Sequence, residues 1–180
     1  MRIVGAVHAA AARQLRLLEE IADALGAREI PFWLRGGWAL EFLLGRVTRD
    51  HADVDLVAWR SDRDAIEDEL TRRGFARERE LPDAAIDFAK DGESVQVLLV
   101  EIGTSGALVC RGFESWPFPD GALDGPLCRI GAVSCRTLAP HALLYEKETY
   151  ALHRGRPLRP KDDASIRLLR ELTQPNRPVT

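Results

Sequence analysis

The stretch from Leu34 to Leu56 constrains the fold more than any other part of the chain. It begins with Gly36-Gly37, directly after an apolar run, and ends with Asp53-Val54-Asp55. The residues between allow a short helix over about 38–44 and a turn before a strand that carries the acids. Glycines at a strand–helix junction let backbone amides approach an anion closely. We interpret the stretch as a phosphate-binding loop followed by a metal site.

The two acids suit a magnesium ion. Asp53 and Asp55 stand two positions apart, and alternate residues of a strand point to the same face of the sheet. Proteins hold Mg²⁺ with one or two carboxylates and leave its other positions to water and nucleotide phosphates. The sequence therefore predicts Mg²⁺ as cofactor, bridging Asp53 and Asp55 to a nucleoside triphosphate.

Three motifs follow one another in this part of the chain: Gly36-Gly37-Trp38, Gly45-Arg46-Val47-Thr48-Arg49 and His51-Ala52-Asp53-Val54-Asp55. In this order they resemble the signature of the aminoglycoside and lincosamide nucleotidyltransferases, among them the aminoglycoside 2''-adenylyltransferases, in the polymerase-β-like superfamily. The resemblance is specific over about residues 32–60 and looser up to about residue 172.

The resemblance implies an α+β fold in which helices flank a mixed, mostly antiparallel sheet. It implies ATP or another nucleoside triphosphate as donor and a hydroxyl of a small molecule, such as an aminoglycoside or lincosamide antibiotic, as acceptor. The acceptor hydroxyl would attack the α-phosphorus in line and expel pyrophosphate. Such a modification would confer antibiotic resistance.

The site residues that we expect fall into two groups. Asp53 and Asp55 are the metal ligands and Gly36-Gly37 the phosphate loop. Further candidates for binding the nucleotide are Arg46, Thr48, Arg49, His51 and Lys147. Each of these has a simpler alternative: the two arginines as solvated charges, His51 as a locally bonded turn residue and Lys147 as part of a helix surface.

The third carboxylate that family members use as metal ligand or general base is not evident. At the expected strand position stands Gln96, which cannot accept a proton at neutral pH. If Asp91-Gly92 is a two-residue hairpin turn, Asp87 lies directly opposite Gln96 and is our third catalytic candidate. The alternatives are that Asp87 is an ordinary exposed polar residue or that Glu101 supplies the acid.

Other elements follow from periodicity and turn signals. We expect helices over about 8–25, 62–73 (after a capping box at 61–64), 140–152 and 162–172. We expect strands over about 32–34, 54–59, 75–80, 86–90, 94–101 and 133–136. The Gly- and Pro-rich segment 103–131 is expected to be a substrate-side loop.

At 180 residues the chain is long enough for one domain, expected over 1–172, with a core at about 27–136, a helical part at about 140–172 and a flexible tail at 173–180. The formal charge of −3 lacks the basic excess of a nucleic-acid binder. No apolar run is long enough to span a membrane, and the 3 cysteines lack metal or disulfide spacing. We expect a cytoplasmic monomer or homodimer.

Two alternatives to an active small-molecule nucleotidyltransferase remain. The first is a degenerate member that binds nucleotide or ligand with little turnover, because Gln96 replaces the third acid. The second is nucleotidylation of a protein or a tRNA end, although the acidic pI of about 5.8 disfavours tRNA.

Overall fold

The computed structural model describes residues 9–79, 84–155 and 157–174. Its helices are α1 (Ala9–Gly26), α2 (Gly36–Leu44), α3 (Arg63–Arg72), α4 (Pro140–Arg154) and α5 (Pro160–Thr173), with a 3-10 turn at Arg60–Asp62. Its strands are β1 (Phe32–Arg35), β2 (Asp53–Trp59), β3 (Ala76–Arg79), β4 (Ala85–Lys90), β5 (Glu93–Ile102), β6 (Leu108–Cys110), β7 (Leu127–Ile130) and β8 (Val133–Arg136).

The main sheet is mixed and mostly antiparallel, which confirms the predicted fold class. Its strand order is β1-β2-β5-β4-β3, and β6 pairs with part of β5. Only β2 and β5 run parallel among these pairs, and their register places Asp55 beside Gln96. The strand that carries the acids therefore lies next to the strand on which we expected the third carboxylate.

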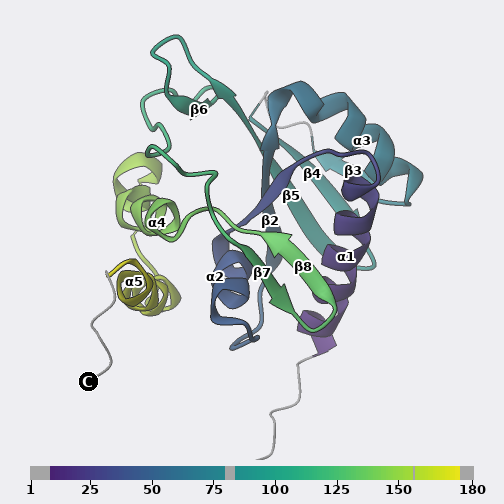
Figure 1. Ribbon diagram of the computed structural model, residues 1–180, viewed down its shortest axis with the longest axis horizontal. Helices are drawn as coiled ribbons and strands as arrows, with labels where there is room; N and C mark the ends of the chain where they lie inside the picture. Colours follow the sequence, from purple (N-terminus) through teal and green to yellow (C-terminus); the bar gives the residue numbers. More distant parts are fainter. Residues whose placement is uncertain (1–8, 80–83, 156, 175–180) are drawn as a thin grey trace, which may run out of the picture.

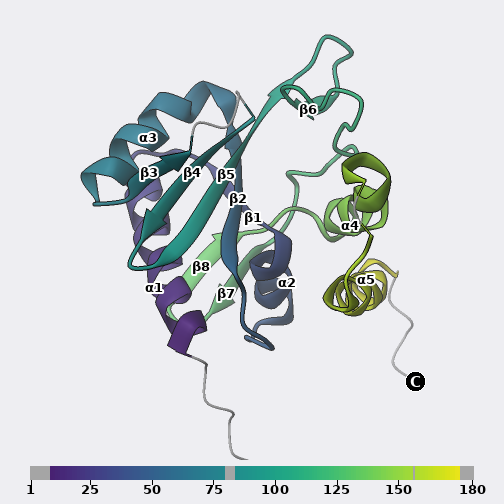
Figure 2. The same ribbon diagram turned by 180° about the vertical axis from the view of Figure 1, so that it is seen from behind.

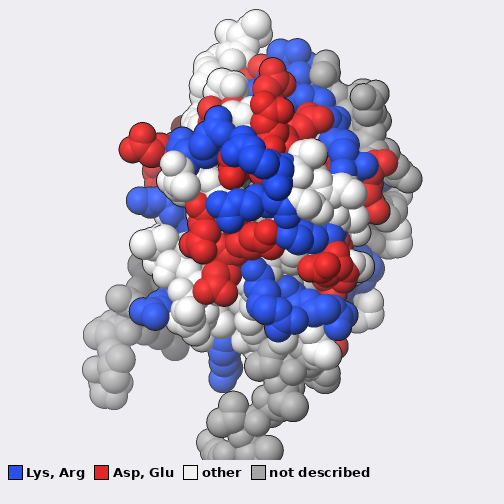
Figure 3. All heavy atoms as spheres, turned by 90° about the vertical axis from the view of Figure 1, so that its right-hand side faces the viewer, with Lys and Arg blue, Asp and Glu red and all other residues white. Residues whose placement is uncertain are grey.

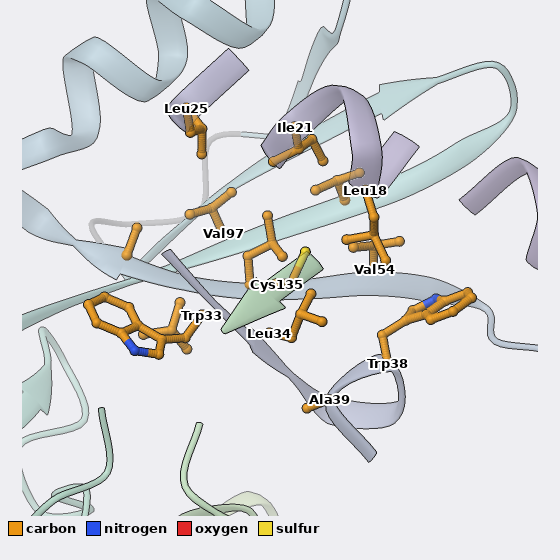
Figure 4. Close-up of a cluster of buried hydrophobic side chains, with 14 of the residues drawn as sticks. Leu18, Ile21, Leu25, Trp33, Leu34, Trp38, Ala39, Val54, Val97 and Cys135 are labelled. Carbon is orange, nitrogen blue, oxygen red and sulfur yellow. The ribbon is translucent and has the colours of Figure 1, made fainter. Parts of the chain in front are cut away.

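Helices lie on both faces of this sheet (Figures 1 and 2). α1 and α3 lie on one face, whereas α2, α4 and α5 lie on the other side of the sheet. The core contains Leu18, Ile21 and Leu25 of α1, which point toward the sheet residues Val54 and Val97 (Figure 4). Because successive strand residues alternate, Asp53 and Asp55 face away from α1, toward the side with α4 and α5.

The hairpin predicted at Asp91-Gly92 is confirmed. Both residues have positive φ, +53° and +78°, as a two-residue turn of this kind requires. Lys90 pairs with Glu93, so Asp87 stands directly opposite Gln96, as the register argument predicted.

Several local predictions need correction. α2 begins at Gly36 rather than at Trp38, so the glycines form its first turn. The capping box expected at 61–64 does not begin α3, because residues 60–62 form a 3-10 turn and the N-cap is Asp62, which makes no side-chain cap hydrogen bond. β8 exists as predicted, but it pairs with β7 in a separate two-stranded sheet, which joins the main sheet through a bridge between Leu34 and Thr137.

Some expectations concern residues outside the described ranges: the end of the strand predicted over 75–80, and most of the tail at 173–180. Thr173 itself still belongs to α5. Cys110, Cys128 and Cys135 are free thiols, and the first and last of them are buried. In the described ranges, no helix combines the length and the apolar character that crossing a membrane requires.

Candidate active site

The acid pair lies at the beginning of β2. Asp53 is the first residue of the strand and is exposed, Asp55 is partly buried, and Val54 between them packs into the core. The pair borders a cleft of about 500 Å³. The cleft is also lined by Glu78, Asp87, Phe88, Ser94, Val95 and Gln96. Residues of β2, β3, β4 and β5 thus meet in one acidic depression.

The glycine pair lies against this acid pair. A Cβ atom on Gly36 would lie 2.4 Å from Oδ2 of Asp55, and Gly36 has a φ of +66°. A Cβ atom on Gly37 would lie 2.2 Å from Nδ1 of His51. Real Cβ atoms do not approach so closely, so both positions need glycine for steric reasons, and Gly36 needs it also for its left-handed backbone conformation. The glycines bring the N-terminus of α2 directly beside Asp55.

Thr48 and His51 both contact Glu41, a buried carboxylate in α2. Glu41 accepts hydrogen bonds from the backbone N of Thr48 at 2.5 Å and from its Oγ1 at 2.8 Å. Nε2 of His51 lies 3.1 Å from Oε1 of Glu41. Glu41 therefore stabilises the turn between α2 and β2. The conformation of this turn determines where β2 begins.

A second buried polar side chain, Gln14, also contacts this turn. Gln14 of α1 accepts a hydrogen bond from Nε1 of Trp38 at 2.8 Å and donates to the backbone O of His51 and to Glu93 at the start of β5. Neither Glu41 nor Gln14 is among the site residues predicted from the sequence. Each is a polar residue within the apolar side of a helix, and that pattern was the available signal.

Arg35 and Glu146 form a further missed pair. Arg35 ends β1 directly opposite Asp55, and its Nε donates to Oε1 of Glu146 in α4 at 2.7 Å. Its Nη1 lies 3.9 Å from Oδ1 of Asp55. Burial would lower the pKa of the Arg35 guanidinium, but the Glu146 and Asp55 carboxylates outweigh burial and raise it. No sequence spacing relates Arg35 to a helix so far along the chain.

The acid pair is electrostatically crowded. Burial raises the pKa of the Asp55 carboxyl from 3.8 to about 6; Arg35 opposes this rise, whereas the neighbouring Asp53 and Glu146 add to it. The positive charge of Lys147 also lowers the pKa of Asp55. A cation beside the two aspartates would relieve this repulsion.

The possible third acids lie in different places. Asp87 lines the cleft and accepts a hydrogen bond from Nε2 of Gln96 at 2.9 Å. Glu101 lies at the far end of β5, where it forms ion pairs with Arg60 and Arg111. Of the two acids, only Asp87 borders the cleft with Asp53 and Asp55.

The basic residues predicted to bind the nucleotide also lie in different places. Arg46 is exposed in the turn after α2, and Nη1 of Arg49 is 3.4 Å from the backbone O of Asp50. Lys147 forms an ion pair with Asp162 of α5 at 3.0 Å. The structure thus brings together the glycine pair, the two aspartates and Asp87, and it places Arg46 on the surface.

The donor set fits a magnesium ion held by two carboxylates. Within the described part of the chain, no three or more His, Cys, Asp and Glu side chains are grouped to hold a metal. Asp53 and Asp55 instead offer oxygen ligands on one face beside an open cleft. Two carboxylates with room for water and phosphate oxygens are typical of Mg²⁺ sites in enzymes that bind nucleotides.

The fold, with an acid pair beside a glycine turn, is a nucleotidyltransferase fold. It is similar to the crystal structure of ANT(2'')-Ia in complex with adenylyl-2''-tobramycin, with a TM-score of 0.75, 25% identity and 90% of each chain covered. It is also similar to the lincosamide adenylyltransferase LnuA with bound lincomycin, with a TM-score of 0.68, 18% identity, and 88% of this chain and 97% of that one covered.

The sequence comparisons identify the family. The profile of the aminoglycoside-2''-adenylyltransferase family matches residues 17–168, so the chain belongs to that family. A stretch of 44 residues is 49% identical to 2''-aminoglycoside nucleotidyltransferases of Klebsiella pneumoniae and Escherichia coli. These alignments cover 24% of this chain and 25% of each relative. The chain thus spans about a quarter of the length of the curated relatives it matches.

Proposed function

We propose that this protein is a Mg²⁺-dependent nucleotidyltransferase of the cytoplasm that transfers a nucleoside monophosphate from ATP, or another nucleoside triphosphate, to a hydroxyl of an aminoglycoside or lincosamide antibiotic. The observation that carries the proposal is the placement of Asp53 and Asp55 beside Gly36, in a cleft that Asp87 also borders. Family membership supports it, because this family includes antibiotic-modifying nucleotidyltransferases.

Each residue of the site would have a distinct role. Asp53 and Asp55 would hold Mg²⁺, which neutralises charge on the phosphates and on the departing pyrophosphate. The amides of Gly36 and Gly37, at the N-terminus of α2, would contact a phosphate of the donor. Lys147 would add positive charge from α4. The core at about 27–136 would thus bind the donor, and the helical part at about 140–172 would close the other side of the single domain.

Asp87 would accept the proton of the attacking hydroxyl. Because Oδ1 of Asp87 accepts a hydrogen bond from Gln96, its carboxylate has a defined position in the cleft. Gln96 would orient this base from the strand position next to Asp55. The acids Glu78 and Asp87 also suit an acceptor that carries amines, as aminoglycosides do.

The proposal is tested by measuring pyrophosphate release with Mg²⁺, each of four nucleoside triphosphates and a panel of aminoglycosides and lincosamides. We expect release that depends on one acceptor class and is at least about 100-fold lower in Asp53→Asn. Asp50→Asn, which removes an exposed carboxylate just before the motif, is the matched control and should retain activity. If nucleotide binds and no acceptor raises the release above background, the proposal fails.

A binding protein with little turnover is the second candidate, and the observation that favours it is Gln96 at the position beside Asp55. Asp87→Asn and Gln96→Asp separate the two functions. If Asp87 is the base, Asp87→Asn abolishes transfer and leaves nucleotide binding intact. If the chain is degenerate, Asp87→Asn changes nothing, and Gln96→Asp creates or raises activity.

A macromolecular acceptor such as tRNA is less well supported. On the face that carries α3, acidic and basic side chains alternate and do not gather by sign (Figure 3). Part of this mixture is a group in which Arg28, Arg72 and Arg73 surround Glu69. This face therefore offers no continuous basic track for a phosphate backbone.

A further inference from the structure

We propose that Arg35 is a positioning residue, which sets α4 against the acid pair through Glu146 and at the same time orients Asp55. This inference rests on the proposed function, because it explains how the donor site is assembled. It concerns two residues outside the three motifs: Arg35, directly before the glycine pair, and Glu146 in α4.

The first argument is the geometry of the guanidinium. Its Nε and Nη2 both contact Oε1 of Glu146, while its Nη1 faces Oδ1 of Asp55 at 3.9 Å. An arginine has five donors in a rigid planar fork, so one side chain can serve two carboxylates in fixed directions. Arg35 thus links a residue of β2 to a residue of α4.

The second argument is burial. The side chains of Arg35 and Glu146 are only 16% and 15% exposed. Water therefore screens this pair less than it screens surface ion pairs, and neither partner can be removed without leaving a charge largely out of water. The pair thus restricts α4 to one orientation relative to β1.

The residue after Glu146 in α4 connects this pair to α5. Lys147 follows Glu146 in α4 and forms an ion pair with Asp162 of α5 at 3.0 Å. Negative and positive groups therefore alternate from Asp55 through Arg35, Glu146 and Lys147 to Asp162. If Glu146 moves, we expect Lys147 and the start of α5 to move with it. The donor site would then lose the side that α4 and α5 close.

The test measures two properties of each variant: the Kd for ATP with Mg²⁺ by calorimetry, and amide hydrogen exchange across 140–154 and 160–173. Glu146→Gln should raise the Kd about tenfold and speed exchange in both helices. Glu148→Gln is the matched control, because Glu148 lies on the same helix as Glu146 and makes an exposed ion pair with Arg170 of α5. It should leave the Kd within twofold of the wild-type value.

A charge exchange separates positioning from simple tethering. The double variant Arg35→Glu with Glu146→Arg restores the attraction between β1 and α4 but puts a carboxylate opposite Asp55. We expect slow exchange in α4 to return while ATP affinity stays low. If ATP affinity returns fully, Arg35 is only a tether and the inference is wrong.

The failure of this inference differs from the failure of the proposed function. If the wild-type protein binds ATP and Glu146→Gln binds it equally well, with unchanged exchange in α4, the inference is wrong and the proposed function stands. If the wild-type protein binds ATP but transfers no nucleotide to any acceptor, the proposed function fails, while the binding and exchange results still decide the role of Arg35.

Discussion

At Gly36 and Gly45 the backbone φ is nearly the same, +66° and +67°, but the surroundings differ. A Cβ atom on Gly36 would collide with Asp55, whereas a Cβ atom on Gly45 would meet nothing within 4 Å. The two glycines therefore separate the cost of the backbone conformation from the need for space beside the acid pair.

We predict that Gly45→Ala lowers the free energy of unfolding by about 1–2 kcal/mol, the cost of a left-handed conformation. Gly36→Ala should cost about 1–3 kcal/mol more, because the added methyl group displaces Asp55. Gly36→Ala should also weaken nucleotide binding, and Gly45→Ala should not. Urea unfolding and ATP titration of both variants measure this. Equal losses in the two variants would show that Gly36 has no special relation to Asp55.

Glu41 gives a second prediction for a single residue. Its two oxygens accept bonds from the backbone N and from Oγ1 of Thr48, so Glu41→Gln removes the negative charge, keeps one acceptor oxygen and must reverse the bond with the Thr48 hydroxyl. We expect a loss of about 1–3 kcal/mol in the free energy of unfolding. Thr48→Val keeps the backbone bond and should lose only about 1 kcal/mol. Urea unfolding tests the order, and a larger loss in Thr48→Val would contradict it.

Two ion pairs join α4 to α5: Lys147 with Asp162, and Glu148 with Arg170. The carboxyl of Asp162 accepts bonds from Lys147 and from the backbone and side chain of Arg159. Burial would raise the pKa of Asp162, but these bonds from Arg159 and Lys147 lower it well below its usual range. A carboxyl with a lowered pKa contributes stability that is complete above its unfolded pKa of about 4 and is lost as the pH falls.

We therefore predict that Asp162→Asn destabilises the protein by about 1–3 kcal/mol near neutral pH and by progressively less as the pH falls below about 4, where the wild-type protein begins to lose this contribution. Thermal unfolding across this pH range measures the difference. Asp163→Asn, an exposed neighbour in the same first turn, should behave like the wild-type protein. A constant difference between Asp162→Asn and wild type at every pH would contradict the assignment.

The sequence predicts these elements well where a local signal exists. The Asp91-Gly92 turn specifies its own register, so the pairing of Asp87 with Gln96 was predictable. The small sheet of β7 and β8 was not fully predictable, because short strands in a Gly- and Pro-rich segment have weak periodicity. The start of α2 was missed by two residues, since glycine usually interrupts a helix.

At the scale of the whole molecule, the observed site differs from the predicted one in contacts between residues that are far apart in the sequence. The acid pair and the glycine pair share one short stretch, so their order alone indicated a nucleotide site. Arg35 and Glu146 are joined only by the packing of α4 beside the sheet, which no local pattern encodes. The comparisons establish the family, whereas the roles of Asp87 and the other site residues stay predictions.

The central claim is that the cleft beside Asp53 and Asp55 transfers a nucleoside monophosphate. The most direct measurement follows two samples of ATP, one labelled at the α-phosphate and one at the γ-phosphate, in the presence of Mg²⁺ and the antibiotic panel. We predict that the α-label appears on an acceptor and the γ-label in pyrophosphate, and that Asp53→Asn loses both. Transfer of the γ-label to the acceptor, or no transfer of the α-label although ATP and acceptor bind, would contradict the claim.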